Sequence, residues 1–140
     1  MARCARFRRA GRAAVVTFGA TIPSQAAFDA FLADWDALYA AGTPFELVFD
    51  MRALAWADPR YCVQMAAFVA HLKADRPPLL VRSVLIVHGR TMRALLWLTF
   101  RLQPPVAPVH VLSRHDAALV AHALCGELPP VVQQVPPYDP

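Results

Sequence analysis

The stretch Phe45-Glu-Leu-Val-Phe-Asp-Met-Arg-Ala-Leu-Ala-Trp-Ala-Asp-Pro-Arg60 decides the fold of this chain. Its first five residues are mostly apolar, which is typical of a strand buried on both faces of a parallel sheet. Asp58-Pro59 is a strong helix start, because Asp accepts backbone N–H groups at the cap and Pro suits the first helical position. The stretch therefore predicts a buried strand that stops at Asp50, a loop, and a helix that begins at Pro59.

Before this stretch, the sequence predicts two strands and a helix. Residues 4–9 and 13–18 flank Ala10-Gly11-Arg12, and the glycine allows a tight hairpin turn. Ser24 can cap a helix whose apolar residues recur at helical spacing, and Gly42 and Pro44 end that helix. We expect an antiparallel hairpin followed by a first helix.

After it, helices and strands alternate to the end of the domain. The helix from Pro59 stops before Pro77-Pro78, and a strand at 81–87, a helix at 90–102 and a strand at 109–112 follow. Ser113 and Asp116 form a capping box for a closing helix that Gly126 ends. The predicted fold is α/β, with a single mixed, mostly parallel sheet, an N-terminal antiparallel hairpin and four helices in the order β-β-α-β-α-β-α-β-α. Residues 1–126 form one domain, and the proline-rich residues 127–140 are expected to be a mobile tail.

Composition indicates one globular core and a nearly neutral body. The chain has 140 residues, of which 57% are hydrophobic and 17% charged, and a net charge of +4. Five arginines lie in the first twelve residues: Arg3, Arg6, Arg8, Arg9 and Arg12. They lack interleaved aromatic residues, so a solvated sheet edge is favoured over nucleic-acid contact, and an organelle-targeting segment is a further alternative.

Cysteine and histidine spacing argues against a metal site. Cys4, Cys62 and Cys125 form no metal-ligand pair, and the odd number favours a reducing, cytoplasmic setting. His115 and His122 share a helix face but lie two turns apart, which is too far to hold one ion. No apolar run is long enough to span a membrane. We therefore expect no metal and no membrane span.

Two stretches resemble the STAS-like and SEC14-like superfamily of interaction and lipid-binding domains. One is the quoted strand, loop and helix cap; the other is Val84-Leu-Ile-Val-His-Gly-Arg-Thr-Met-Arg-Ala-Leu-Leu-Trp-Leu-Thr-Phe100 with the strand and capped helix after it. The resemblance covers about residues 13–124 and implies the same fold and a binding role. Anti-sigma-factor antagonists of the family carry a phosphorylatable serine directly after the capping Asp. Here that position is Pro59, so the resemblance does not extend to partner switching.

An anion-binding edge is one candidate site. The loops after three parallel strands are expected at one sheet edge, and each leads to a helix that begins beside an arginine: Arg60, Arg90 and Arg114. Such a cluster can hold a phosphate, a lipid headgroup or an acidic segment; alternatively, the three arginines are simply solvated. His88, at a strand end, is a further candidate for ligand contact.

A polar stripe on the helix at 90–102 is a second candidate. Helical spacing places Leu95, Leu98 and Leu102 on an inward stripe, and the opposite stripe carries Arg90, Arg93, Trp97 and Arg101. An exposed indole between arginines suits a protein interface or an anionic membrane surface. In the alternative, Arg93 and Arg101 cover the ring by cation–π contact.

Sequence motifs of catalysis are missing. There is no nucleophile elbow, Walker sequence or dinucleotide-binding glycine motif, so we predict no catalytic residue, no cofactor and no enzyme. Asp50 and Asp58 are interpreted as structural loop residues with Pro59, although they could also pair as carboxylates. The first functional hypothesis is a non-catalytic STAS-like module that binds a protein partner or itself. The alternative is a SEC14-like module for a small amphiphile, lipid headgroup or other anion.

Overall fold

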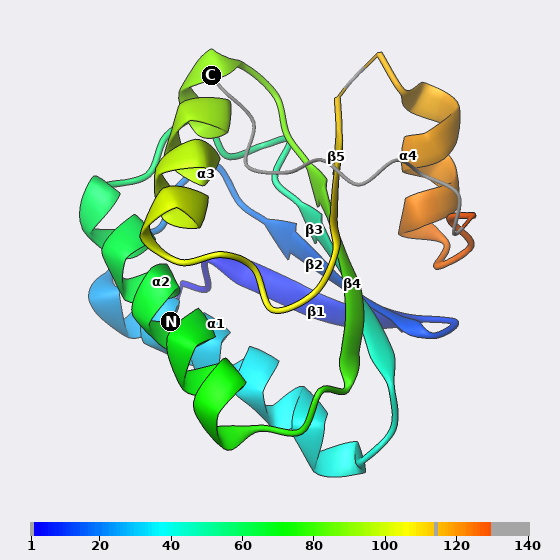
Figure 1. Ribbon diagram of the computed structural model, residues 1–140. Coiled ribbons are helices and arrows are strands. Elements are labelled where there is room, and N and C mark those ends of the chain that lie inside the picture. Colours follow the sequence, from blue (N-terminus) through cyan, green and yellow to red (C-terminus); the bar gives the residue numbers. More distant parts are fainter. Residues whose placement is uncertain (1, 114, 130–140) are drawn as a thin grey trace.

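A computed structural model describes residues 2–113 and 115–129 of the chain (Figure 1). One sheet contains all five strands, in the order β1-β2-β3-β4-β5. Strands β1 and β2 are antiparallel, and all other neighbours are parallel. The elements are β1 (Ala5–Ala10), β2 (Ala13–Phe18), α1 (Gln25–Ala37), the 3-10 helix η1 (Leu38–Ala41), β3 (Phe45–Asp50), α2 (Pro59–Asp75), β4 (Leu80–Ile86), α3 (Arg90–Leu102), β5 (Val109–Leu112) and α4 (Ala117–Leu124). The predicted fold class is confirmed.

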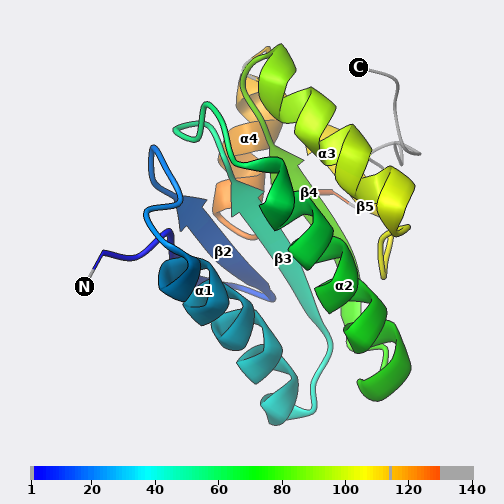
Figure 2. The ribbon, with the colours of Figure 1, turned by 90° about the vertical axis from the view of Figure 1, so that its left-hand side faces the viewer.

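The helices cover the two faces of the sheet unequally. Helices α1, α2 and α3 lie together on one face, whereas α4 lies on the other (Figure 2). Each of the first three helices connects two neighbouring parallel strands, so the chain crosses the same face three times. The three-helix side contains most of the core, and α4 covers a smaller apolar cluster built on Val15, Val48, Val84 and Ile86.

Strand β1 forms one edge of the sheet, as its arginines predict. Arg6, Arg8 and Arg9 are exposed, which places charge along an edge that could otherwise pair with another chain. Gly11 makes the hairpin turn with a φ of 58°, a value that favours glycine. Gly126 approaches this hairpin so closely that an added Cβ would lie 2.0 Å from the carbonyl oxygen of Ala10. The end of α4 therefore docks directly on the hairpin.

Aromatic side chains fill the three-helix side of the sheet. Phe31 of α1 lies 5.0 Å from Phe18 and 6.2 Å from Phe49, measured between ring centroids. Trp35, one turn later, packs on Phe49 at 5.3 Å and on Phe68 of α2 at 5.0 Å. These rings join α1, α2 and the central strands into one apolar layer.

An ion pair on the α4 side holds the end of the described chain. Arg82 of β4 donates to the Glu46 carboxylate at 2.5 Å, and both side chains are largely buried. The same guanidinium donates to the carbonyl oxygens of Leu128 and Pro129, and Leu128 is itself buried. The first residues of the expected tail at 127–140 are thus held in place. Leu128 packs in the apolar cluster under α4, and the Leu128 and Pro129 carbonyl oxygens accept hydrogen bonds from Arg82. The folded domain extends to at least Pro129, and the rest of the expected tail lies outside the described residues.

Helix α4 starts later than the predicted capping box implies. Asp116 is the residue before the helix, and its carboxylate accepts hydrogen bonds from the backbone N–H and hydroxyl of Ser113. These bonds close the turn that precedes the helix.

Within the described ranges, no helix combines the length and apolar character needed to cross a membrane.

Candidate functional site

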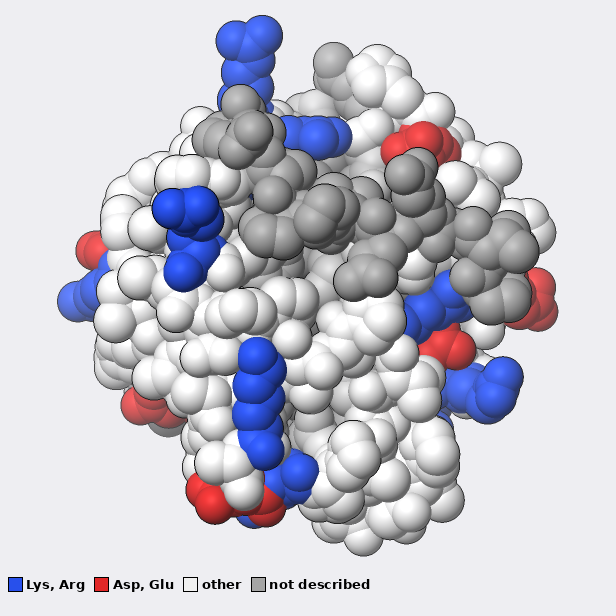
Figure 3. Space-filling view, in the orientation of Figure 1, with Lys and Arg blue, Asp and Glu red and all other residues white. Residues whose placement is uncertain are grey.

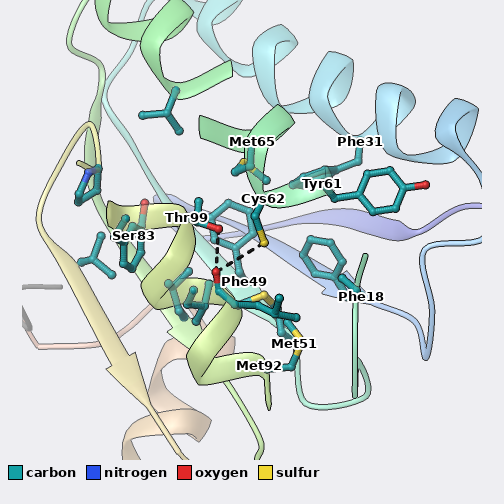
Figure 4. Close-up of a pocket in the computed structure, with 18 of the residues that line it drawn as sticks. Phe18, Phe31, Phe49, Met51, Tyr61, Cys62, Met65, Ser83, Met92 and Thr99 are labelled. Atoms are coloured by element: carbon teal, nitrogen blue, oxygen red, sulfur yellow. Dashed lines mark hydrogen bonds between the residues drawn. The ribbon is translucent and has the colours of Figure 1, made fainter. Parts of the chain in front are cut away.

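An apolar cavity lies between the sheet and the three helices that cover it. Its open space is about 130 Å³. The floor comes from β2, β3, β4 and β5, and the walls come from α1, α2, α3 and the loops after β3 and α3. Figure 4 shows side chains from these elements pointing toward a common space. A packed core leaves few voids larger than a water molecule, so a space of this size is a candidate ligand site.

Rings and sulfur atoms dominate the cavity lining. The aromatic lining residues are Phe18, Phe28, Phe31, Trp35, Phe49, Tyr61 and Phe100, and the sulfur-containing ones are Met51, Cys62, Met65 and Met92. Methionine is flexible and polarisable, and its sulfur makes favourable contacts with ring edges. Such a lining suits a flat apolar molecule and can adjust to its shape.

Two polar side chains in the lining are already satisfied. The Thr99 hydroxyl donates to the carbonyl oxygen of Leu95 at 2.9 Å, and the Cys62 thiol donates to the same oxygen at 3.6 Å (Figure 4). Burial raises the pKa of the Cys62 thiol, so it stays protonated and can donate at neutral pH. The Cys62 bond joins α2 to α3, the Thr99 bond lies within α3, and both donors are thereby occupied.

Ser83 differs from these two groups. It lies on β4 in a cross-strand row with Ala14, Leu47 and Val109, so it is a polar side chain in an otherwise apolar row. It is 8% exposed and lines the cavity. Its hydroxyl makes no hydrogen bond within residues 2–113 and 115–129, and it is not among the fully enclosed unpaired polar atoms of that range, which are the Trp35 indole nitrogen and the Tyr39 hydroxyl.

The structural roles expected of Asp50, Asp58 and Pro59 are present. The Asp58 side chain accepts from the backbone N–H of Arg60 at 3.0 Å, and Pro59 is the first residue of α2. The buried Asp50 carboxylate accepts from the backbone N–H of Arg52 at 3.2 Å and from its guanidinium at 2.8 Å. Each aspartate therefore organises its own end of the loop between β3 and α2.

We expect Asp50→Asn to destabilise the protein at neutral pH by about 1–3 kcal/mol, because a charged hydrogen-bonded pair is lost. The Arg52 guanidinium holds the pKa of Asp50 below its ordinary value of 3.8. A lowered folded-state pKa contributes stability above about pH 4 that is lost as the pH falls through the lowered pKa. Urea unfolding from pH 7 to pH 3 should therefore show the difference between wild type and variant shrinking below pH 4.

Asp75→Asn is the matched control, because Asp75 is an exposed partner of His71. Its effect should stay within about 0.5 kcal/mol. A difference for Asp50→Asn that stays constant down to pH 3 would contradict the assigned pairing.

The loops after the parallel strands β3, β4 and β5 lie at one edge of the sheet, where the arginine edge was predicted. From this edge, α2 and α3 run along one face of the sheet and α4 along the other. Arg60 turns toward its own neighbours: its guanidinium lies 3.9 Å from Asp58, donates to the Tyr61 hydroxyl at 3.1 Å and stacks on that ring. His88 and Arg90 are exposed. Arg114 lies outside the described residues.

The stripe on α3 is rotated from its predicted position. Leu95 lines the cavity as expected, but Leu102 is 49% exposed, and the buried residues are Met92 and Thr99. The reason is that α3 packs on both the sheet and α2, and the bond from Thr99 to the Leu95 carbonyl allows a polar residue to face inward. Of the predicted stripe of Leu95, Leu98 and Leu102, the first two are partly buried and Leu102 is exposed.

The opposite side of α3 carries the predicted polar residues. Arg101 is exposed and lies 5.4 Å from the Trp97 ring centroid, which is the cation–π contact expected in the covered-ring alternative. Trp97 and Arg93 are both partly buried. Charged side chains on the visible face are scattered between wide uncharged areas (Figure 3).

The cavity residues were missed by sequence reasoning, with one signal available. A serine within the apolar run Val81-Arg-Ser-Val-Leu-Ile-Val87 is unusual at a buried strand position, and it could have identified Ser83. Trp56, which is 56% exposed on the loop between β3 and α2, was also missed. Its neighbours Leu54 and Ala57 line the cavity, so this loop links an exposed ring to the cavity wall.

Among the described residues, no group of His, Cys, Asp and Glu side chains could hold a metal ion. Comparison with models of known protein families, with curated proteins and with solved structures found no match to this chain.

Proposed function

We propose that this domain binds a small, mostly apolar molecule in the cavity between the sheet and helices α1–α3. The cavity itself is the observation that supports the proposal, because its lining combines aromatic rings, methionines and a hydroxyl without a partner in the described chain. This corresponds to the alternative hypothesis of a small-amphiphile module. The resemblance to STAS-like and SEC14-like domains agrees with a binding role.

Cavity size limits the ligand class. Drug-sized ligands occupy pockets of about 300–1,000 Å³, whereas an apolar cavity of about 150 Å³ accommodates benzene. The observed space of about 130 Å³ therefore fits a single ring or a short branched chain and does not enclose a whole lipid. Toluene is a suitable probe.

We expect toluene at about ten times its Kd to stabilise the wild-type protein by about 1.4 kcal/mol. Thermal unfolding measures this gain, and ¹H–¹⁵N spectra should show shifts at cavity residues. Leu95→Phe adds a ring to the lining and should remove the gain, because the added ring occupies the ligand's space.

Leu102→Phe is the matched control, since it makes the same change on the same helix at an exposed position. This variant should still be stabilised by toluene to the same extent as the wild type. Equal stabilisation of both variants by toluene, or no stabilisation of the wild type, would contradict the proposal.

A STAS-like module that binds a protein partner or itself is the second candidate function. The favouring observation is a pair of exposed apolar side chains, Trp56 and Val63, which are 56% and 57% exposed on either side of the start of α2. Arg60 lies between them in the sequence and supplies a charged group that is common at interfaces. A dimer in the native mass spectrum that Trp56→Ala dissociates, together with no toluene effect, would favour this second function.

A further inference from the structure

We propose that the Ser83 hydroxyl selects ligands that carry one polar group, so that the cavity prefers a phenol-like ring to the corresponding hydrocarbon. This inference rests on the proposed function and adds the ligand's chemical class. It starts from the contrast between Ser83 and the polar groups that α2 and α3 contribute to the lining.

The other donors of the α2–α3 wall are committed within the protein. Thr99 and Cys62 both donate to the Leu95 carbonyl, and the Tyr61 hydroxyl accepts from Arg60 and points away from the middle of the cavity (Figure 4). Ser83 is more than nine-tenths buried and has no such partner in the described part of the chain. Its hydroxyl is therefore available to a ligand.

The surroundings of Ser83 determine what that ligand can be. The floor positions Leu85 and Val109 and the neighbouring strand residue Leu47 are apolar, so a second polar group on the ligand would be buried there without a partner. A hydroxyl can both donate and accept one hydrogen bond, which matches an alcohol, a phenol or an aromatic N–H. Rings and sulfur atoms on the opposite walls favour an aromatic body.

Phenol and toluene test the inference, because they differ only in a hydroxyl in place of a methyl group. Their Kd values are measured by calorimetry for wild type and Ser83→Ala, and the ratio Kd(toluene)/Kd(phenol) is compared between the two proteins. This comparison cancels the different hydration of the free ligands. We expect the ratio to fall by about fivefold in Ser83→Ala, which corresponds to one net hydrogen bond.

Toluene binding by Ser83→Ala confirms that the variant is folded and its cavity intact. Thr17→Ala is the matched control, because it removes an exposed hydroxyl from β2 and should leave the ratio unchanged. A ratio that is equal in wild type and Ser83→Ala, or one that falls in Thr99→Val instead, overturns the role of Ser83 while toluene binding preserves the proposed function. Failure of the wild type to bind toluene and phenol overturns both.

Discussion

The Phe31→Ala variant should lose about 3–5 kcal/mol of its free energy of unfolding, which is the range for removing a large buried ring. Phe31 is 2% exposed. Its centroid lies 5.0 to 6.2 Å from the rings of Phe7, Phe18, Phe28, Trp35 and Phe49. These rings come from α1 and three strands, so they cannot all move into the space that alanine leaves. Urea denaturation measures the loss.

Val63→Ala provides the comparison for this variant. Val63 lies on α2 and is 57% exposed, so its truncation should change stability by no more than about 0.5 kcal/mol. The loss of unfolding free energy for Phe31→Leu should lie between those for Phe31→Ala and Val63→Ala, because leucine keeps part of the buried volume. A loss below about 1 kcal/mol for Phe31→Ala would show that the ring cluster contributes little to the stability of the core.

Arg82→Met should cost about 3 kcal/mol, because it leaves the Glu46 carboxylate largely buried without its cation. It also leaves the carbonyl oxygens of Leu128 and Pro129 without a donor. The double variant Arg82→Met/Glu46→Leu should recover much of the loss, since no unpaired charge remains. Chemical denaturation of the two variants and of Glu46→Leu separates the pairing energy from the loss of packing.

Arg3→Met is the control for the ion pair. Arg3 lies 3.6 Å from Asp34, but both side chains are well exposed, so the loss should be below about 1 kcal/mol. If Arg82→Met and Arg3→Met cost the same, the buried pair contributes no more than a surface pair.

Local signals in the sequence were sufficient for the fold. Asp58-Pro59 starts α2 and Gly11 turns the hairpin as predicted, because a cap and a positive φ depend on the residue itself and its close neighbours. The alternation of strands and helices then leaves few possible topologies. The anchored Leu128 was not predicted, because its burial depends on Arg82, which lies 46 residues earlier.

The cavity is a property of packing and has no local signal. It arises where three helices and four strands fail to fill the space between them, and no periodicity measures that volume. The rotation of α3 has the same origin: Thr99 faces inward because Leu95 offers an acceptor, whereas hydrophobicity alone placed Leu102 there. The arginine edge was inferred from chain order alone, which does not show on which face each helix leaves the sheet.

The strand order has a consequence for how the chain is made. Every strand pairs with the strand that precedes it in the sequence, so each pairing can form as soon as the later strand has been synthesised. The hairpin can receive β3, then β4, then β5, without waiting for a distant segment to insert between them. Only the final step, in which Leu128 and Pro129 reach Arg82, joins the end of the described chain to strands made much earlier. The contact of Leu128 and Pro129 with β4 therefore depends on a sheet that has already assembled.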